Sequence, residues 1–401
     1  MLRNRRFATA LFSLFFMTGL DGVAVAGDPD YESIAENVVN QSVGIQPGEV
    51  VIITGGQTEI ELMESLQVAV AKAGGQPIVR LNLPRANKRV IMETPMEHLE
   101  RTPTAGLLQA RMADAFINVA SVQDPKLFAD VPEERLAATR QAGAVLSDAL
   151  RNVRFRSVSL GQTGGIPTEA YAASQGADYE TMVNMFWKAI GVAPDRLAEA
   201  GRNVVGLLRP GARLHLTSAA GSDLSFAIDQ LQPRINAGRS GDVLSVTGPS
   251  SVWLPAGEAY ACVKSDSASG TLVVPRTTYR GMDIENLELK FENGRIASLS
   301  AGTHEEALRK YFDSSSPESQ NLSVIDVGLN PHSQPLEGSH YYSWEMGGMV
   351  TLQVGNNSWA GGNNNADAGL SFHVAGTTLT IDGKKVVGNG ELSSDYRVPS
   401  R

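Results

Sequence analysis

The chain is poor in cysteine and in positive charge, and each shortage argues against a class of protein. A single cysteine among 401 residues, Cys262, rules out an intramolecular disulfide. We interpret it as a small buried residue rather than a nucleophile, because it lies in the strand-like run Tyr260-Ala-Cys-Val263. The net charge of -9, without any basic run, argues against a nucleic-acid partner.

Signatures of nucleotide-binding proteins and serine hydrolases are missing as well. Gly55-Gly56 follows a strand-like run, but neither G-x-G-x-x-G nor G-x-x-x-x-G-K is present. We therefore interpret the two glycines as a turn. Ser222-Asp223 is not part of a G-x-S-x-G elbow, which argues against a serine nucleophile there.

The N-terminal segment has the pattern of a secretory signal. Three arginines among the first six residues precede an apolar run from Phe7 to Leu20, and Ala24-Val-Ala26 is a small-x-small cleavage site. The run is shorter than the roughly 20 apolar residues that a membrane span needs. We expect residues 1–26 to be removed, leaving 375 residues (401 minus 26) that are exported to a periplasm or to the outside without a membrane anchor.

Residues 27–207 are predicted to form a doubly wound α/β domain. Short apolar runs typical of buried parallel strands alternate with amphipathic helical patterns, which is the arrangement of a doubly wound sheet. The strands are expected at 50–53, 77–81, 115–119 and 154–160, and the helices at 30–39, 58–73, 133–142, 177–190 and 194–207.

Residues 208–401 are predicted to form a β-rich domain, because short strands dominate after Pro210. The strands are expected at 213–217, 224–228, 258–263, 271–275, 287–291, 295–299, 378–381 and 385–387, with one helix at 305–312. Asn293-Gly294 and Asp382-Gly383 predict tight hairpin turns.

A series of short motifs runs through the chain in a fixed order. It includes Pro47-Gly48-Glu49, Gly221-Ser-Asp-Leu-Ser-Phe226, Pro255-Ala-Gly-Glu258, Gly328-x-Asn330 and Gly361-Gly362-Asn363. This series resembles the aminopeptidase T and aminopeptidase S family, the thermophilic metalloproteases. The resemblance implies a homodimer whose β-rich half holds two divalent metals. Such metals lower the pKa of a bridging water and polarise the scissile carbonyl of a peptide.

The same resemblance puts most of the family's metal-ligand positions on residues that cannot bind a metal well. The first ligand matches Glu258. The remaining ligand positions fall on Val324, Thr351, Gly369 and Ser371, and a catalytic tyrosine position falls on Ser358. The H-x-D of the last two ligands occurs nowhere in the chain. We therefore expect no dinuclear site and no metal cofactor. The loss also argues against the mononuclear-iron chemistry of the related ring-opening dihydroxypyridine dioxygenases.

A rearranged metal site is the alternative. Asp326 lies on the same strand face as Val324, and His332, Glu337 and His340 share one loop, with His373 further along the chain. Two histidines and a carboxylate suffice for one divalent ion such as zinc, cobalt or iron. We prefer an ordinary solvated loop, because ligands need supporting contacts that the sequence does not reveal.

Three functions remain open on the sequence. The first is an exported relative of metallo-aminopeptidases that lacks the peptidase site and binds a peptide or small ligand. The alternative is an active metal-dependent aminopeptidase, with Glu258, Asp326 and the loop histidines as rearranged ligands. The third is a structural homodimer or assembly subunit, which the apolar face of the predicted helix at 177–190 favours.

Overall fold

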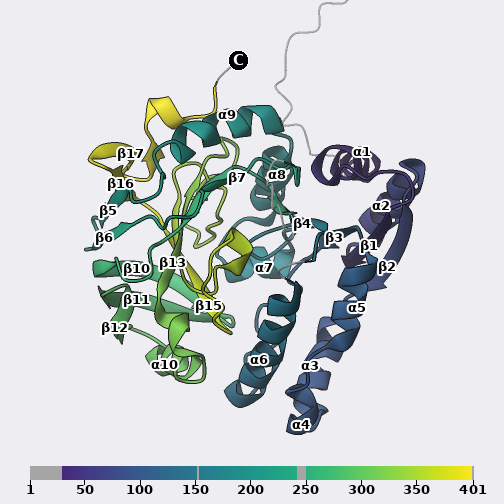
Figure 1. Cartoon of the computed structure of the whole chain (residues 1–401), viewed down its shortest axis with the longest axis horizontal. Coiled ribbons are helices and arrows are strands. Elements are labelled where there is room, and N and C mark those ends of the chain that lie inside the picture. Colours follow the sequence, from purple (N-terminus) through teal and green to yellow (C-terminus); the bar gives the residue numbers. More distant parts are fainter. Residues whose placement is uncertain (1–28, 151–152, 242–249, 400–401) are drawn as a thin grey trace, which may run out of the picture.

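The computed structural model describes residues 29–150, 153–241 and 250–399 (Figure 1). The predicted signal peptide, residues 1–26, lies outside these ranges. No helix within them is long and apolar enough to cross a membrane.

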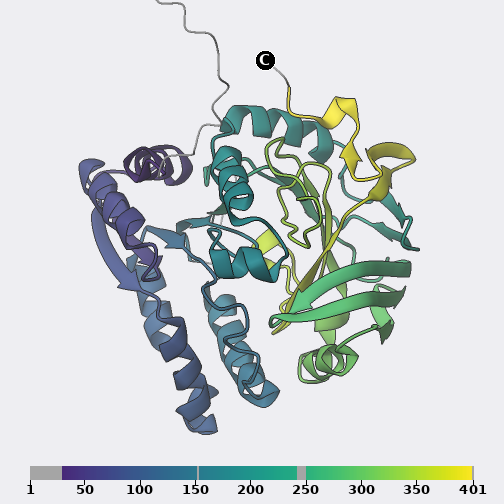
Figure 2. The same ribbon diagram turned by 180° about the vertical axis from the view of Figure 1, so that it is seen from behind.

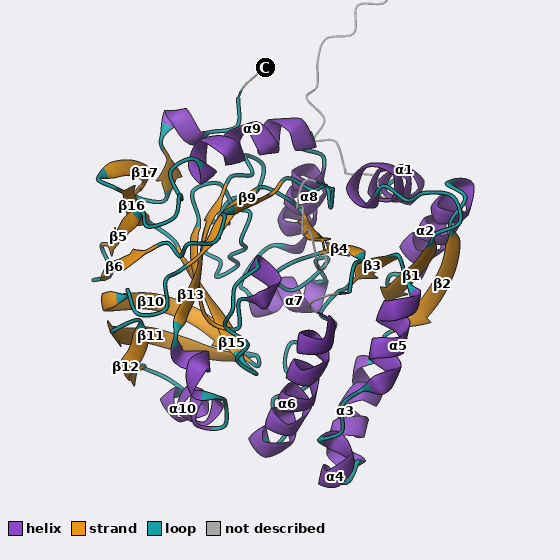
Figure 3. Cartoon of the chain, in the orientation of Figure 1, coloured by secondary structure: helices purple, strands orange, loops and turns teal. Residues whose placement is uncertain are grey.

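The first half of the chain forms a parallel sheet with the strand order β2-β1-β3-β4-β8 (Figure 3). Its strands are β1 (Val50–Gly55), β2 (Gln76–Leu81), β3 (Ala115–Val119), β4 (Arg156–Leu160) and β8 (Ser250–Leu254). The four predicted strands are confirmed. The fifth, β8, was not predicted, and it joins this sheet from the second half of the chain by pairing with β4.

Helices alternate with these strands along the chain, as expected for an α/β unit. They are α1 (Tyr31–Asn37, continued by a wider turn at Val38–Val43), α2 (Ile60–Lys72), α3 (Pro84–Glu93), α4 (Met96–Leu99), α5 (Thr104–Met112), α6 (Glu133–Leu150), α7 (Glu169–Ser174), α8 (Tyr179–Ile190) and α9 (Pro194–Val205). The predicted end of α6 at residue 142 was wrong, because the helix continues to Leu150. The segment that forms α3, α4 and α5 had no predicted structure.

Two antiparallel sheets form the second half (Figure 2). The larger sheet has the order β12-β11-β10-β6-β5-β16-β17-β18, and the smaller has the order β15-β14-β13-β9-β7. The larger contains β5 (Arg213–Ser218), β6 (Asp223–Ala227), β10 (Ser269–Tyr279), β11 (Met282–Glu292), β12 (Arg295–Ser300), β16 (Thr377–Ile381), β17 (Lys384–Gly388) and β18 (Glu391–Leu392). The smaller contains β7 (Arg234–Asn236), β9 (Glu258–Cys262), β13 (Leu322–Gly328), β14 (Val350–Gly355) and β15 (Gly369–Val374).

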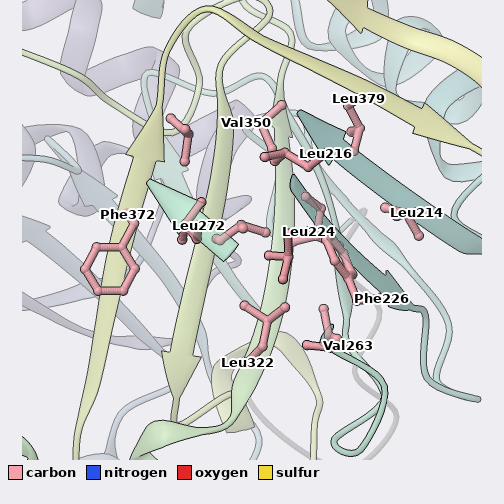
Figure 4. Close-up of a cluster of buried hydrophobic side chains, with 14 of the residues drawn as sticks. Leu214, Leu216, Leu224, Phe226, Val263, Leu272, Leu322, Val350, Phe372 and Leu379 are labelled. Carbon is pink, nitrogen blue, oxygen red and sulfur yellow. The ribbon is translucent and has the colours of Figure 1, made fainter. Parts of the chain in front are cut away.

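Apolar side chains from the two antiparallel sheets meet in one core (Figure 4). The side chains drawn there include Leu214, Leu216, Leu224, Phe226, Val263, Leu272, Leu322, Val350, Phe372 and Leu379. Helix α10 (Glu305–Asp313) adds Leu308 and Phe312 to the same core. Since this core occupies one face of the smaller sheet, the other face of that sheet is available for polar residues.

Both predicted hairpin turns are confirmed by their backbone conformations. Asn293 and Gly294 have φ of 51° and 83°, and Asp382 and Gly383 have φ of 47° and 79°. Two consecutive positive φ angles match the right-handed twist of the flanking strands. Strand β11, which leads into the first turn, is longer than expected, and so is its neighbour β10, because each extends to 11 residues.

The boundary near residue 208, which separates residues 27–207 from residues 208–401, stays a prediction. Helix α9 ends at Val205, close to it, but β8 crosses back into the parallel sheet. Around β2, several apolar side chains of this half remain exposed, including Leu81 at 53%, Val90 at 57% and Leu108 at 67%.

Candidate functional site

The candidate site lies on the outer face of the smaller antiparallel sheet. Side chains alternate between the two faces of a strand. Because Ala259, Ile325 and Leu352 belong to the core between the sheets, Glu258 and Asp326 lie on the opposite face. Strands β9, β13 and β14 are buried along their whole length. The polar residues of this face are therefore shielded from bulk water.

One row of aligned residues crosses this outer face. Asp326 on β13 lies opposite Tyr260 on β9 and opposite Thr351 on β14. The row continues to Arg234 on β7 and to His373 on β15. Directly opposed residues on neighbouring strands have Cβ atoms about 4.5–5.5 Å apart. Five chemically different side chains therefore occupy consecutive positions across the sheet.

Glu258 lies in the next row and is 2% exposed. Gln162 Nε2 donates a hydrogen bond to Glu258 Oε1, and Asn236 Nδ2 donates to Glu258 Oε2 over 3.4 Å. Asn236 is the residue opposite Glu258 on β7, and Gln162 follows β4 of the parallel sheet. Both partners are neutral amides, so neither cancels a negative charge on this carboxyl group.

Gly328 lets a third acidic residue, Glu345, approach the sheet. A Cβ atom at Gly328 would lie 2.1 Å from the carbonyl oxygen of Met346 and 2.5 Å from that of Trp344. No side chain fits into that space. The glycine therefore allows the segment 344–346 to pack directly on β13.

Glu345 is 1% exposed and is held at both its backbone and its carboxyl group. The N–H of Asn330 donates to its carbonyl oxygen over 2.8 Å. The hydroxyls of Ser333 and Ser343 donate to its two carboxyl oxygens over 2.8 and 2.5 Å. These partners are again neutral.

The three buried acidic residues Glu258, Asp326 and Glu345, which we call the carboxyl trio, all have raised pKa values. Burial and the nearby Glu345 raise the pKa of Glu258 to about 8, against the lowering effect of its hydrogen bonds with Gln162 and Asn236. Burial, Glu258 and Glu345 raise the pKa of Asp326 well above its ordinary value. Burial raises the pKa of Glu345. At neutral pH Glu258 is therefore mostly protonated.

Asp326 differs from the other two members of the trio because it has no hydrogen-bond partner. Both of its carboxyl oxygens, and the hydroxyl of Tyr260 beside it, are buried without a partner in the described part of the chain. An unpaired buried polar group costs about 1–3 kcal/mol. These atoms therefore mark the place on the outer face where an additional donor would be most favourable.

An aromatic layer borders the carboxyl trio. Trp359 meets Trp253 and Trp344 edge-on, with ring centroids 5.3 and 5.8 Å apart, and lies 5.3 Å from the tilted ring of Tyr260. Trp344 also meets His373 edge-on at 5.7 Å. These five residues form the aromatic layer. It contains three of the four tryptophans of the chain, which makes tryptophan fluorescence a sensitive probe of this site.

His373 is neutral and its ring is held by hydroxyl groups. Burial lowers its pKa to about 4. Its Nδ1 lies 2.8 Å from Thr351 Oγ1, and its Nε2 lies 3.4 Å from Thr163 Oγ1. Both ring nitrogens are therefore engaged with neutral side chains.

The structure gathers the degenerate ligand positions on this same outer face. They are Val324 on β13, Thr351 on β14, and Gly369 and Ser371 on β15. Ser358 begins a short helical turn next to the sheet, and its hydroxyl donates to Asn356 Oδ1 over 2.7 Å. The positions that the resemblance marked are close in space, but they lack carboxylate and imidazole groups.

The loop histidines lie near cationic side chains. Burial, Lys188 and Arg196 lower the pKa of His332. Arg276 Nη1 lies 2.5 Å from His340 Nε2. Glu337, in the same loop, is exposed. A guanidinium beside an imidazole nitrogen opposes the binding of a second cation there.

The residues present do not fit a pair of divalent metals. Among residues 29–150, 153–241 and 250–399, no three His, Cys, Asp or Glu side chains are placed to hold a metal ion together. At the positions that the resemblance assigned to ligands, Glu258 alone offers a carboxylate, and amide groups occupy both of its oxygens. Two divalent ions need several charged or imidazole donors each.

Sequence reasoning found Glu258, Asp326 and His373 but missed Glu345 and the amides that bind Glu258. Glu345 follows the apolar segment Tyr341-Tyr-Ser-Trp344, and a lone acidic residue in such a segment is a signal of a buried carboxyl group. Gln162 and Asn236 have no comparable signal, because distant segments bring them to Glu258. Cys262 is 3% exposed and burial raises its pKa to about 12, which confirms an inert buried thiol.

Comparison with known proteins places these observations in a family. The family of thermophilic metalloproteases (M29) matches residues 28–341. Aminopeptidase AmpS of Bacillus subtilis (strain 168) is 26% identical over 331 residues, which cover 76% of this chain and 78% of AmpS.

Two solved structures share the fold. Wild-type AmpT from Thermus thermophilus has a TM-score of 0.66 at 17% identity and covers 90% of this chain and 98% of its own. The 2,5-dihydroxypyridine dioxygenase from Pseudomonas putida KT2440 has a TM-score of 0.58 at 18% identity and covers 92% and 98%. At such identities the likeness concerns the fold alone.

Proposed function

The chain belongs to the thermophilic metalloprotease (M29) family, and on that premise we propose that it binds the free amino end of a short peptide without hydrolysing it through a metal pair. The single observation that carries the proposal is the unpartnered, fully buried carboxyl group of Asp326. Tyr260 of the aromatic layer lies opposite it on β9, and burial, Glu258 and Glu345 raise its pKa. An ammonium group satisfies such an environment.

Two physical effects favour an ammonium ligand here. A cation held close to the carboxyl trio lowers the pKa of its members and becomes their counter-ion. The same cation gains about 0.5–2 kcal/mol beside a tryptophan or tyrosine face, and the aromatic layer supplies both ring types. A neutral ligand satisfies neither requirement.

Arg234 suits the other end of the same ligand. It lies in the row of Asp326, on the far side of Tyr260. No hydrogen bond or ion pair engages its guanidinium within the described ranges. Two strand spacings of about 4.8 Å separate the two positions. This separation suits the ammonium and the carboxylate of a very short peptide.

The family relationship supports a peptide rather than another amine. The relative from Bacillus subtilis is named an aminopeptidase, and aminopeptidases engage the free amino end of their substrates. In this chain most positions that the resemblance assigns to metal ligands hold residues without a carboxylate or imidazole, and acidic and aromatic side chains lie near them. Recognition without turnover is the function that these residues support best.

Tryptophan fluorescence tests the proposal with the dipeptide Leu-Leu and its N-acetylated form. The background variant is Trp187→Phe, which removes the one tryptophan outside the aromatic layer. After treatment with a chelator, the free dipeptide is expected to change the emission saturably, and the acetylated form is not. Asp326→Asn is expected to abolish the response, whereas Glu337→Gln, a change at an exposed position, leaves it intact.

Two outcomes contradict the proposal. An equal response to both dipeptides shows that the amino group is not recognised. Release of free leucine that a chelator stops and added zinc, cobalt or iron restores establishes the alternative, an active metal-dependent aminopeptidase. That enzyme then depends on Glu258 and Asp326, so Glu258→Ala is expected to remove its activity.

Export and dimerisation are further proposals. We propose that the chain acts in a periplasm or outside the cell, without a membrane anchor, and sequencing the N-terminus of the secreted protein tests the cleavage after residue 26. We propose a homodimer, which the exposed apolar residues around β2 support. Light scattering that gives the mass of one chain contradicts the dimer.

A further inference from the structure

A cavity lies at the carboxyl edge of the parallel sheet, apart from the candidate site. Its volume is about 1200 Å³, and its lining includes neither the carboxyl trio nor the tryptophans of the aromatic layer. The loops after β1, β3, β4 and β8 all contribute to its wall. Helices α1 and α8 supply much of the rest. Apart from Ala237, Gly238 and Arg239, which follow β7, the wall belongs to the parallel sheet and its helices, and the cavity is separate from the candidate site described above.

The topology of the sheet makes this edge a preferred place for ligands. From β1 the chain crosses to β2 on one side, and it then returns to β3 on the other side of β1. In open parallel sheets, ligands bind outside the carboxyl ends of the strands at the point where the strand order reverses. Here that point lies between β1 and β3, and the loops after both strands line the cavity.

A fixed polar group forms the base of the cavity. Glu59, after β1, is 7% exposed and accepts hydrogen bonds from the N–H of Gly56 over 2.9 Å and from the hydroxyls of Thr58 and Ser121. Gln123 Nε2 donates to the same two hydroxyls, over 2.8 Å each. These hydrogen bonds join the loop after β1 to the loop after β3, at the point where the strand order reverses. The carboxyl group of Glu59 lies at their centre, and all of its donors are neutral.

The charge of the lining selects the ligand class. The cavity is lined by five acidic residues, Asp30, Glu59, Glu169, Glu180 and Asp195. Arg239 is the single basic residue among the lining residues that the structure describes. Arg239 pairs with Asp195 over 2.6 Å. The lining therefore has an excess of four negative charges, and a cavity with such a field concentrates cations.

The rim adds aromatic surface to this negative field. Glu169 and Glu180 are exposed at the mouth and both raise the pKa of Tyr179, after the larger effect of burial, so the two acids stand close to that ring. Trp187 lies on the same helix as Tyr179 and meets Tyr31 edge-on at 6.2 Å. Carboxylates beside tyrosine and tryptophan rings are suited to alkylammonium groups.

We propose that this cavity is a second ligand site that binds a small linear polyamine. One ammonium group lies at the base, with Glu59 and its hydroxyl neighbours. Another lies at the mouth, with Glu169, Glu180 and the aromatic rings. The methylene chain between them packs on the apolar part of the wall, which Ile166 and Leu254 line.

Isothermal titration calorimetry of the mature chain with spermidine tests this site. Saturable binding of one spermidine is expected. The double variant Glu169→Gln, Glu180→Gln changes exposed positions only, so it is expected to fold normally. It is expected to weaken spermidine binding about tenfold, since each exposed ion pair contributes up to about 1 kcal/mol. Glu59→Gln is expected to weaken binding further.

The matched control is Glu292→Gln, which removes an exposed acidic residue from β11, far from the cavity in sequence and fold. It is expected to leave the affinity unchanged. Three results overturn the proposal: no saturable heat with spermidine, equal affinities of the Glu169→Gln, Glu180→Gln variant and the wild type, or an equal loss in the control. The Asp326→Asn variant, which impairs the candidate site, is expected to bind spermidine normally.

Discussion

Replacing Glu258 by glutamine is predicted to change how the stability of the protein depends on pH. Burial raises the pKa of this carboxyl group to about 8 in the folded chain, whereas an unperturbed glutamate titrates near 4.5. Between these two values the folded chain holds a proton that the unfolded chain has released. The free energy of unfolding therefore falls as the pH rises from 4.5 to 8, and it is highest, for this group, below 4.5.

The size of the effect follows from the difference between the two pKa values. Each pKa unit corresponds to about 1.36 kcal/mol, so a difference of roughly 3.5 units removes at most about 5 kcal/mol of stability by pH 8. Typical domains unfold with about 5–15 kcal/mol, so the loss is easily measured. Glutamine also removes the negative charge that ionised Glu258 places near Asp326 and that raises the pKa of Asp326. The dependence of the unfolding free energy on pH therefore becomes flatter still.

Urea unfolding of the wild type and the Glu258→Gln variant, at intervals from pH 5 to pH 8.5, measures this difference. Glutamine preserves the hydrogen bond from Gln162 and disturbs only the long 3.4 Å bond from Asn236. We expect the wild type to lose several kcal/mol across this range and the variant to lose much less. Parallel profiles refute the reasoning, because Glu258 then releases its proton in the folded chain as easily as in the unfolded one.

Three further predictions concern neighbouring groups. Asp326→Leu is expected to stabilise the unliganded chain at pH 8 by about 1–3 kcal/mol in urea unfolding, because leucine has a similar volume and no polar atoms, so the unpaired buried carboxyl oxygens are removed; a loss of stability contradicts this. His373→Gln is expected to reduce the loss of unfolding free energy as the pH falls from 6.5 to 4, because the folded chain keeps this histidine neutral while the unfolded chain takes up a proton. If the variant loses as much stability in this pH range as the wild type, the lowered pKa of His373 is contradicted. Gly328→Ala is expected to cost at least about 2–3 kcal/mol, because its Cβ would lie 2.1 Å from the carbonyl oxygen of Met346; Gly143→Ala, in open space on α6, is the control and is expected to gain up to about 1 kcal/mol.

The sequence was sufficient for the strands whose apolar pattern is local. The runs at Val50–Gly55 and Ala115–Val119 are rich in β-branched residues and are buried. Helix α3 was not predicted, because its large apolar residues, Val90, Ile91 and Met92, are consecutive and do not recur over further turns, and none of its residues is buried. Strand β8 is short and pairs with β4, which lies more than 90 residues earlier in the chain.

The candidate site was predicted only in part for a related reason. Glu258 belongs to a recognisable motif, and Asp326 lies in an apolar strand, so both could be named from the sequence. Glu345 reaches them through the bare backbone of Gly328, and Gln162 comes from the loop after β4. Such contacts depend on how distant segments pack, which no local pattern records.

Elemental analysis of the purified mature chain tests the central claim most directly. The protein is incubated with zinc, cobalt or iron, separated from free metal by gel filtration and mild dialysis, and analysed for each element. The account predicts far less than one bound metal per chain, because amides occupy Glu258 and the other ligand positions lack charged donors. Retention of one or two ions per chain that is lost in Glu258→Ala contradicts it.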